Sequence, residues 1–183
     1  MDQAVVKALQ DIVGAENVSD AKPVVEAYVT RAIMDVSSKA PAAVVRPKSV
    51  EEIQAVLRLA NEKKIPVVPH SGGLSGGEAT PTRDGSILLD LRRINQIIEV
   101  NTDARYMIVE PGVTSAQAWK HMQDNYPDYR PGVPDGAPPS ATIIGDHLDR
   151  GFHFMSTRYG SAADAVLGLE AVLPTGEVVR TGA

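Results

Sequence analysis

The sequence predicts an α+β fold in which a βαβ unit is followed by a largely antiparallel sheet. Three observations predict it. A strand, a helix and a second strand fall within about 27 residues, between positions 43 and 69, a connection that is right-handed in nearly all known cases. Short apolar segments separated by turn residues come next, and a Pro-Thr-Gly turn near the end joins two more. With 43% hydrophobic and 22% charged residues over 183 positions, the chain has the composition of a globular protein.

The first part of the chain combines helical periodicity with clear boundary residues. Its expected elements are a helix over 2–13, a strand over 43–46, a helix from 49 to about 64 and a strand over 65–69. Gly14 is suited to end the first helix. Ser49 and Glu52 have capping-box spacing, so each side chain can satisfy a backbone donor at the start of the second helix. Ile53 and Val56 begin the apolar face of that helix.

After residue 85 the pattern changes to short strands and turns. The expected elements are strands over 86–91, 97–100 and 106–110, a helix over 114–125, and two strands within 165–180. Pro111 and Gly112 predict a tight turn, and Thr114 is a plausible N-cap. A proline-rich loop occupies 127–139, and Pro174-Thr175-Gly176 predicts the final hairpin.

Composition excludes several classes of function. The 18 basic and 23 acidic residues give a net charge of -5, and aromatic residues make up 4%, which argues against a nucleic-acid surface. The absence of cysteine excludes disulfides and thiolate zinc sites, and four scattered histidines lack metal-ligand spacing, so no metal is expected. No apolar stretch predicts a secretory signal or a membrane span, and a cytoplasmic protein is the default expectation.

The most informative segment follows the strand at 65–69. Residues 71–77, Ser-Gly-Gly-Leu-Ser-Gly-Gly, hold four glycines and two serines. Glycines let successive N–H groups point into one concavity, where they can bind an anion such as a pyrophosphate. The segment is neither a Walker A loop, since no Gly-Lys-Ser/Thr follows, nor a Rossmann fingerprint, since no helix follows. Taken alone, it is also compatible with a flexible surface loop.

Longer strings carry a resemblance to a family. IPVVPHSGGLSGGEATPTRDGSILLDLRRINQIIEVN and YMIVEPGVT, with AAVVRPKSVEEIQAVLRLANEKKIPVVP ahead of them, resemble the FAD-binding domain of the vanillyl-alcohol oxidase and 4-cresol dehydrogenase superfamily. SATIIGDHLDRG and RYGSAADAVLGLEAVLPTGEVVRTG resemble its second FAD-contacting region. The resemblance covers about residues 40–183. It implies a small βαβ subdomain beside a mainly antiparallel sheet, with the cap domain absent.

The resemblance also implies a division of the chain and a set of FAD contacts. The expected segments are an N-terminal helical segment over 1–40, a βαβ subdomain with the pyrophosphate loop over 41–110, and an incomplete second FAD-binding subdomain over 111–183. The expected contacts are His70, Ser71, Gly72, Gly73, Leu74, Ser75, Gly76 and Gly77 in the loop, and Pro111, Gly112, Thr142, Gly145, Asp146, Gly151, Tyr159 and Gly160 beyond it. Simpler interpretations stay open: Gly112 as a turn, Gly160 as a bend, and Asp146 and Asp149 as solvated loop carboxylates.

Many members of the family attach FAD covalently to a histidine directly after Ser-Gly-Gly. Leu74 occupies that position here and cannot form the bond, so we expect no covalent link from this loop. His70 lies four residues earlier and departs from the pattern. A tether from a substrate domain is outside this sequence.

The implied activity is oxidation of a small molecule by hydride transfer to FAD. The segment RYGSAADAVLGLEAVLPTGEVV favours a 2-hydroxy acid or related alcohol as substrate, whereas ATIIGDHLDRG and EPGVT favour a phenol. Asp135 is a doubtful counterpart of an aspartate that assists at the flavin in the phenol branch, and His147 or His153 could approach the flavin. The catalytic residues and the electron acceptor stay unknown. A third possibility is a flavin-binding module that is inactive until a C-terminal segment or subunit supplies the substrate domain.

Overall fold

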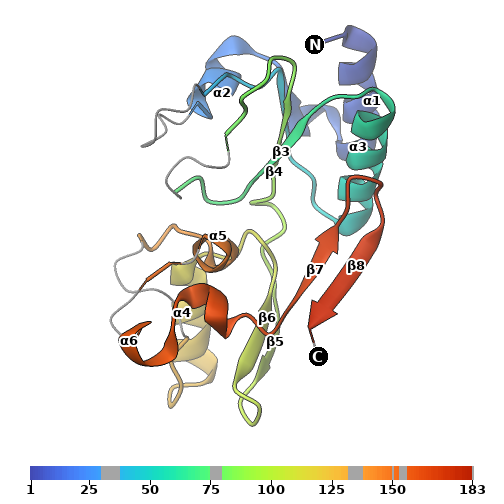
Figure 1. The fold of residues 1–183 in the computed structure, drawn as a ribbon. Helices are drawn as coiled ribbons and strands as arrows, with labels where there is room; N and C mark the ends of the chain where they lie inside the picture. The colour runs from blue at the N-terminus through green and yellow to red at the C-terminus, as the bar shows by residue number, and fades with distance from the viewer. Residues whose placement is uncertain (30–37, 75–79, 132–137, 150, 153–155, 183) are drawn as a thin grey trace. The chain divides into compact units, whose positions relative to one another are not determined.

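The computed structural model describes residues 1–29, 38–74, 80–131, 138–149, 151–152 and 156–182. The chain divides into two compact units (Figure 1). The first contains residues 1–93 together with 168–183, and the second contains residues 94–167. This division follows compactness alone, and the segments 1–40, 41–110 and 111–183 stay a prediction about subdomains. No helix in the described ranges is both long and apolar enough to cross a membrane.

A four-stranded sheet forms the centre of the first unit. Its strands are β1 (Val18–Ser19), β2 (Ala43–Val45), β3 (Val67–His70) and β4 (Ile87–Asp90), in the order β1-β2-β4-β3. Both β2 and β3 run parallel to β4, and β1 is antiparallel to β2. The two strands of the expected βαβ unit therefore flank β4 instead of pairing with each other. All four residues of β4 are buried, as expected for the central strand of a parallel sheet.

The helices of this unit are α1 (Gln3–Val13), the 3-10 turn η1 (Ala15–Asn17), α2 (Lys22–Ala27) and α3 (Val50–Glu62). Gly14 ends α1 with φ +90, and its N–H donates to the Gln10 carbonyl. Ser49 caps α3 as predicted, because its Oγ accepts from the Glu52 N–H at 3.3 Å. The Glu52 carboxylate accepts from the Lys48 N–H at 2.8 Å, one residue earlier than the capping box places it. Helix α2 was not predicted.

The C-terminal strands β7 (Gly168–Val172) and β8 (Val178–Gly182) form the predicted antiparallel hairpin. Its turn is attached to α3, since the Gly176 carbonyl accepts from Gln54 Nε2 at 2.6 Å and from Arg58 Nη2 at 3.3 Å. Figure 1 shows the red hairpin alongside α3. The last strands of the chain thus belong to the first unit.

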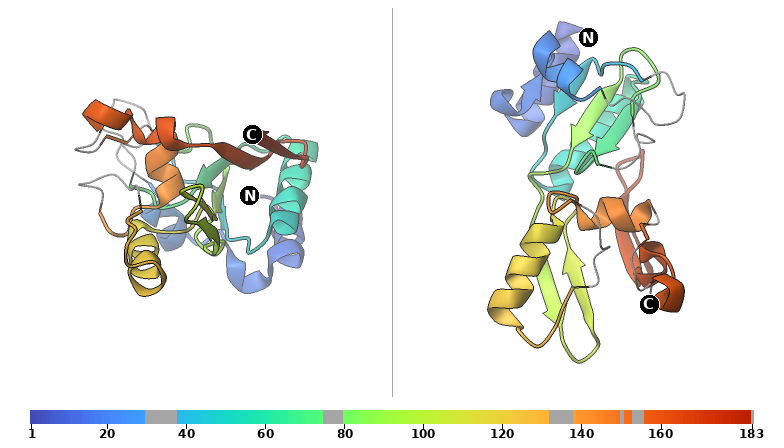
Figure 2. Two further views of the ribbon diagram at one scale, coloured as in Figure 1. Left: turned by 90° about the horizontal axis from the view of Figure 1, so that it is seen from below. Right: turned by 90° about the vertical axis from the view of Figure 1, so that its left-hand side faces the viewer.

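The second unit contains β5 (Ile97–Asn101) and β6 (Tyr106–Val109), which pair antiparallel, and helix α4 (Ser115–Asn125). Val113, Ala118 and Ile143 form its core, against which Ile97, Met107 and Val109 pack. Figure 2 shows the yellow helix α4 lying along the β5–β6 ribbon. Thr114 and Gln117 form a complete capping box at the start of α4, as the predicted N-cap requires. The short elements α5 (Ile143–Leu148), α6 (Ser156–Tyr159) and η2 (Ala162–Ala165) follow and were not predicted.

Candidate cofactor site

The glycine-rich segment leaves the sheet at the carboxyl ends of two parallel strands. His70 is the last residue of β3, and it pairs in register with Asp90, the last residue of β4. In open α/β sheets, ligands bind outside this edge of the strands. Ser71, Gly72, Gly73 and Leu74 emerge there, whereas Ser75, Gly76 and Gly77 lie outside the described residues.

Two features of the Gly73 position favour glycine. Its backbone has φ +66, in the left-handed region that side-chain-bearing residues rarely adopt. A Cβ at this position would lie 2.5 Å from Cε1 and 2.8 Å from Nε2 of His70. The loop backbone is therefore in direct contact with the His70 ring. This contact was not predicted from the sequence.

A hydrogen-bonded network lies next to His70. Asp90, whose side chain is 1% exposed, accepts from the Tyr28 hydroxyl at 2.7 Å and from Arg92 Nη2 at 2.6 Å. Its Oδ1 also accepts from the Arg92 N–H and Nε, both at 3.0 Å. Arg92 Nη2 donates to the Tyr28 hydroxyl at 2.8 Å, and the Tyr28 ring meets the His70 ring edge-on at 5.2 Å. The buried carboxylate therefore has several donors, as a buried charge requires.

The charges of the described side chains next to His70 cancel near neutral pH. Burial opposes ionisation of Asp90, but hydrogen bonds from Arg92 and Tyr28 outweigh it and hold the pKa of the carboxyl below its usual value. Burial, with a smaller contribution from Asp90, raises the pKa of the Tyr28 phenol. Burial also lowers the pKa of His70, so its imidazole is neutral. Asp90 and Arg92 thus neutralise each other beside two uncharged rings.

The second unit gathers most of the remaining predicted contacts around the start of α5. Thr142 is buried and bridges to Thr114, and the Ile143 N–H donates to the Val113 carbonyl at 3.0 Å. These contacts bring the turn at Pro111 and Gly112 to the same place, since the Val113 N–H closes that turn on Glu110. Gly145 lies on α5 itself.

Asp146 has an unusual environment for a carboxylate. It lies on α5 and is partly buried, so the solvated-loop interpretation is wrong for this residue, whereas Asp149 is exposed just beyond the helix. Its Oδ2 is buried and finds no hydrogen-bond partner within the described part of the chain. Burial raises the pKa of the Asp146 carboxyl, His147 opposes the shift and Asp149 adds to it.

The last three predicted contacts lie just downstream. The Gly151 N–H donates to the Asp146 carbonyl, and the Gly151 carbonyl accepts from Ala162, each at 2.8 Å. Gly160 has φ +83, and a Cβ there would collide with the Asp164 carboxylate. Both observations disfavour a side chain at this position, which a simple bend does not require. Tyr159 is 60% exposed and contacts only Arg158 among the ring interactions of the described residues.

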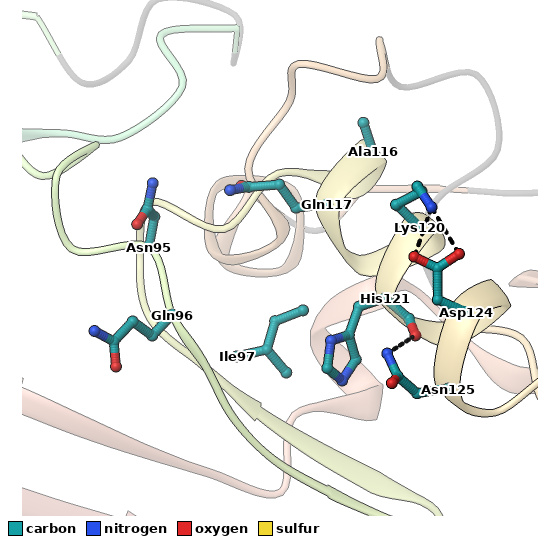
Figure 3. A pocket seen from close by; sticks show the side chains of 9 residues that line it. All are labelled: Asn95, Gln96, Ile97, Ala116, Gln117, Lys120, His121, Asp124 and Asn125. Atoms are coloured by element: carbon teal, nitrogen blue, oxygen red, sulfur yellow. Dashed lines mark hydrogen bonds and ion pairs between the residues drawn. The ribbon is translucent and has the colours of Figure 1, made fainter.

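A groove of about 660 Å³ lies elsewhere in the second unit, between α4 and the segment 95–97 (Figure 3). His121 lines it, in agreement with its predicted place on a helix, and its ring lies 6.0 Å from that of Tyr126. Two of its polar side chains bond within α4, Lys120 to Asp124 and Asn125 to the His121 carbonyl. None of the predicted FAD contacts lines this groove.

The described residues fit the phosphate end of a dinucleotide cofactor. Glycine backbone at the carboxyl edge of β3 could supply N–H donors, and the buried carboxylate of Asp90 there is neutralised by Arg92. His147 Nδ1 is engaged with the Ile143 carbonyl at 2.8 Å, and His153 and Asp135 lie outside the described residues. Within the described ranges no three His, Asp or Glu side chains gather as a metal site.

Sequence reasoning missed Tyr28, Asp90 and Arg92. Asp90 was included in the predicted strand over 86–91, although an acidic residue directly after Ile-Leu-Leu is a usable signal for a buried, paired carboxylate. Nothing local marks Tyr28, because its partners Asp90 and Arg92 lie 62 and 64 positions away.

Comparison with known proteins agrees with this geometry. The family model described as FAD binding domain matches residues 41–182. The 4-cresol dehydrogenase flavoprotein subunit of Pseudomonas putida is 37% identical over 150 residues, which are 80% of this chain and 28% of that protein. D-lactate dehydrogenase of Archaeoglobus fulgidus is 37% identical over 145 residues, covering 76% of this chain and 30% of that protein.

Solved structures give the same result. A p-cresol methylhydroxylase structure with substrate bound aligns with a TM-score of 0.86 and 32% identity, over 98% of this chain and 35% of that one. The 4-ethylphenol oxidase from Gulosibacter chungangensis aligns with a TM-score of 0.86 and 27% identity. The chain thus spans about a third of these structures. Since the family model matches most of the chain, the predicted resemblance is confirmed, and the chain belongs to the FAD-binding domain family of the vanillyl-alcohol oxidase and 4-cresol dehydrogenase superfamily.

Proposed function

We propose that this chain is the FAD-binding part of a flavin-dependent oxidoreductase. The observation that carries the proposal is the glycine segment at the carboxyl edge of the parallel sheet, where Gly73 adopts φ +66 against His70. The family match over residues 41–182 supports it. When bound, FAD supplies the hydride-accepting chemistry, and the protein supplies binding and orientation.

In this proposal the segment from Ser71 to Gly77 binds the pyrophosphate through backbone N–H groups. The balanced charge of the described side chains next to His70 supports this role, because the neutral imidazole and the Asp90–Arg92 pair do not oppose the approach of a dianion. Pro111, Gly112, Thr142, Gly145, Asp146, Gly151, Tyr159 and Gly160 are proposed as further FAD contacts, on the resemblance and on the clustering of most of them around α5.

We propose that the loop holds FAD without a covalent bond. Leu74 is 51% exposed and carries no nucleophilic atom. Treatment of the FAD-loaded chain with trichloroacetic acid should leave the yellow colour in the supernatant. A flavin that stays in the protein pellet would refute a purely non-covalent attachment.

FAD binding can be tested directly on the purified chain. After incubation with FAD and removal of unbound ligand by gel filtration, flavin absorption should elute with the protein. Riboflavin, which lacks the pyrophosphate, serves as the matched ligand and should not be retained. Retention of both ligands would contradict recognition through the pyrophosphate loop, and retention of neither would contradict FAD binding.

For the complete enzyme, we propose a 2-hydroxy acid or related alcohol as substrate. The supporting feature is the C-terminal segment that forms β7 and β8, which is similar to the hydroxy-acid branch. Oxidation of a phenol is the second candidate, favoured by the aligned p-cresol methylhydroxylase structure. Overall identity does not separate the two, since a 4-cresol dehydrogenase subunit and a D-lactate dehydrogenase are both 37% identical to this chain.

Turnover assays distinguish these candidates from an inactive binding module. The FAD-loaded chain is supplied with glycolate, D-lactate or a 4-alkylphenol, together with an artificial electron acceptor. Acceptor reduction with hydroxy acids supports the first proposal, and reduction with the phenol supports the second. FAD binding without any turnover supports a module that requires a further segment or subunit carrying the substrate domain.

A further inference from the structure

Tyr28 lies ahead of the region that the family model matches, which begins at residue 41. It directly follows α2, and its N–H donates to the Val25 carbonyl at 3.3 Å. Its ring packs against the small core formed by Val25, Val44 and Leu88, which ties it to the two central strands of the sheet. The position of Tyr28 is thus set by the core of the first unit.

From Tyr28 a continuous set of contacts leads to the pyrophosphate loop. Its hydroxyl is held between Asp90 Oδ2 at 2.7 Å and Arg92 Nη2 at 2.8 Å. Its ring meets the His70 ring at 5.2 Å, with the two planes 71° apart, an edge-to-face geometry. On the loop side, His70 occupies the space into which a Cβ of Gly73 would project.

We propose that Tyr28 is a positioning residue for the pyrophosphate loop, acting through His70 to hold the backbone around Gly73 in the form that accepts FAD. The inference rests on the proposed FAD-binding function. Tyr28 itself is assigned no contact with FAD. Holding a loop in its bound conformation increases affinity because less conformational freedom is lost when the ligand binds.

The two parts of the Tyr28 side chain have separable effects. The ring restrains His70, and the hydroxyl fixes the ring by its bonds to Asp90 and Arg92. Tyr28→Leu removes both, which leaves His70 free to move and more exposed to water. Tyr28→Phe keeps the ring and removes only the hydroxyl, so it should retain most of the effect.

The first measurement needs no ligand. The Cε1 proton of His70 is followed by NMR as a function of pH in the FAD-free chain, and its resonance is assigned with His70→Asn. Because burial lowers the pKa of His70, Tyr28→Leu should raise that pKa toward the ordinary histidine value. Tyr28→Phe should leave the titration close to wild type.

The second measurement is FAD affinity, by quenching of flavin fluorescence. Tyr28→Leu should weaken FAD binding about threefold to tenfold, the range expected when ligand binding must order one side chain. Tyr126→Leu is the matched control, because Tyr126 also contacts a histidine, His121, but does so in the other unit. It should change neither the FAD affinity nor the His70 titration.

The outcomes separate the two proposals. If wild type does not bind FAD, the proposed function fails, while the His70 titration still tests the contact with Tyr28. If Tyr28→Leu lowers only the melting temperature and leaves both the titration and the FAD affinity unchanged, the positioning role is refuted. Should Tyr28→Leu not fold, Tyr28→Phe decides by FAD affinity alone: a loss of about twofold supports the role, because the hydroxyl no longer fixes the ring, and an unchanged affinity overturns it.

Discussion

Replacing Gly73 with alanine tests the loop geometry most directly. The new Cβ would lie 2.5 Å from Cε1 of His70, and the backbone would have to keep φ +66. Because the alanine variant can avoid both costs by leaving this loop conformation when no ligand is present, we expect the cost to appear mainly as weaker FAD binding. The melting temperature of the FAD-free chain should change little.

The expected loss of FAD affinity in Gly73→Ala follows from two contributions. A side-chain-bearing residue in the left-handed region costs roughly 1–2 kcal/mol. Overpacking a filled site typically adds about 1–3 kcal/mol, but His70 is able to move aside and remove part of it. The strain alone corresponds to a loss of FAD affinity of about 5-fold to 30-fold, since each 1.4 kcal/mol is a factor of about ten.

Gly85→Ala is the matched control. Gly85 has φ +80, but no atom lies within 4 Å of the place that a Cβ would occupy, so the substitution imposes similar strain without a collision. It should destabilise the fold by about 1–2 kcal/mol and leave FAD affinity unchanged. Fluorescence titration and thermal unfolding measure the two effects. Equal FAD affinities for Gly73→Ala and wild type would refute the assigned geometry of the loop.

Three further changes have defined outcomes. Asp146→Asn should stabilise the chain near neutral pH. Because the pKa of Asp146 is raised, its stability contribution is present below the ordinary carboxyl pKa and is lost as pH rises through the raised value. Thermal unfolding at a series of pH values should show a flatter profile for the variant, and a profile parallel to that of wild type would contradict this. Gly176→Ala places a Cβ 2.7 Å from Arg58 Nε at φ +81, so it should cost at least about 1–2 kcal/mol of unfolding free energy in denaturant titrations. Thr114→Ala removes the capping box of α4 and should cost about 1 kcal/mol, while Thr175→Ala in the hairpin turn serves as the comparison.

Local patterns predicted most of the regular elements. Helix α1 with Gly14, helix α4 with Thr114, and the hairpin around Gly176 all depend on boundary residues whose chemistry acts within a few positions. The place of β4 between β2 and β3 was not predictable in this way. Strand order depends on long-range pairing, and an all-apolar strand does not specify which neighbours it takes.

The candidate site also contains a part that local sequence predicted and a part that depends on long-range contacts. The glycine loop was recognisable through the longer strings around it that resemble the family, since several glycines and serines in one segment are by themselves also compatible with a surface loop. Helix α5 was missed because its six residues are too few to show periodicity, although Thr142 at its N-cap and Asp146 within it were predicted as contacts. The network at Asp90 depends on side chains brought together by the sheet, and a single acidic residue in a sequence does not identify its partners.

The charge distribution at the loop explains why backbone geometry should dominate FAD binding. A chain with net charge -5 has no general attraction for a dianionic pyrophosphate, and the edge at His70 adds none, because Arg92 is committed to Asp90 and the imidazole is neutral. We therefore expect the favourable term to come from alignment of the backbone N–H dipoles of the loop on the ligand, and such short-range contacts are screened little by salt. Alignment depends on the conformational freedom of glycine, so a single methyl group at Gly73 should weaken FAD binding more than the loss of an exposed charge elsewhere.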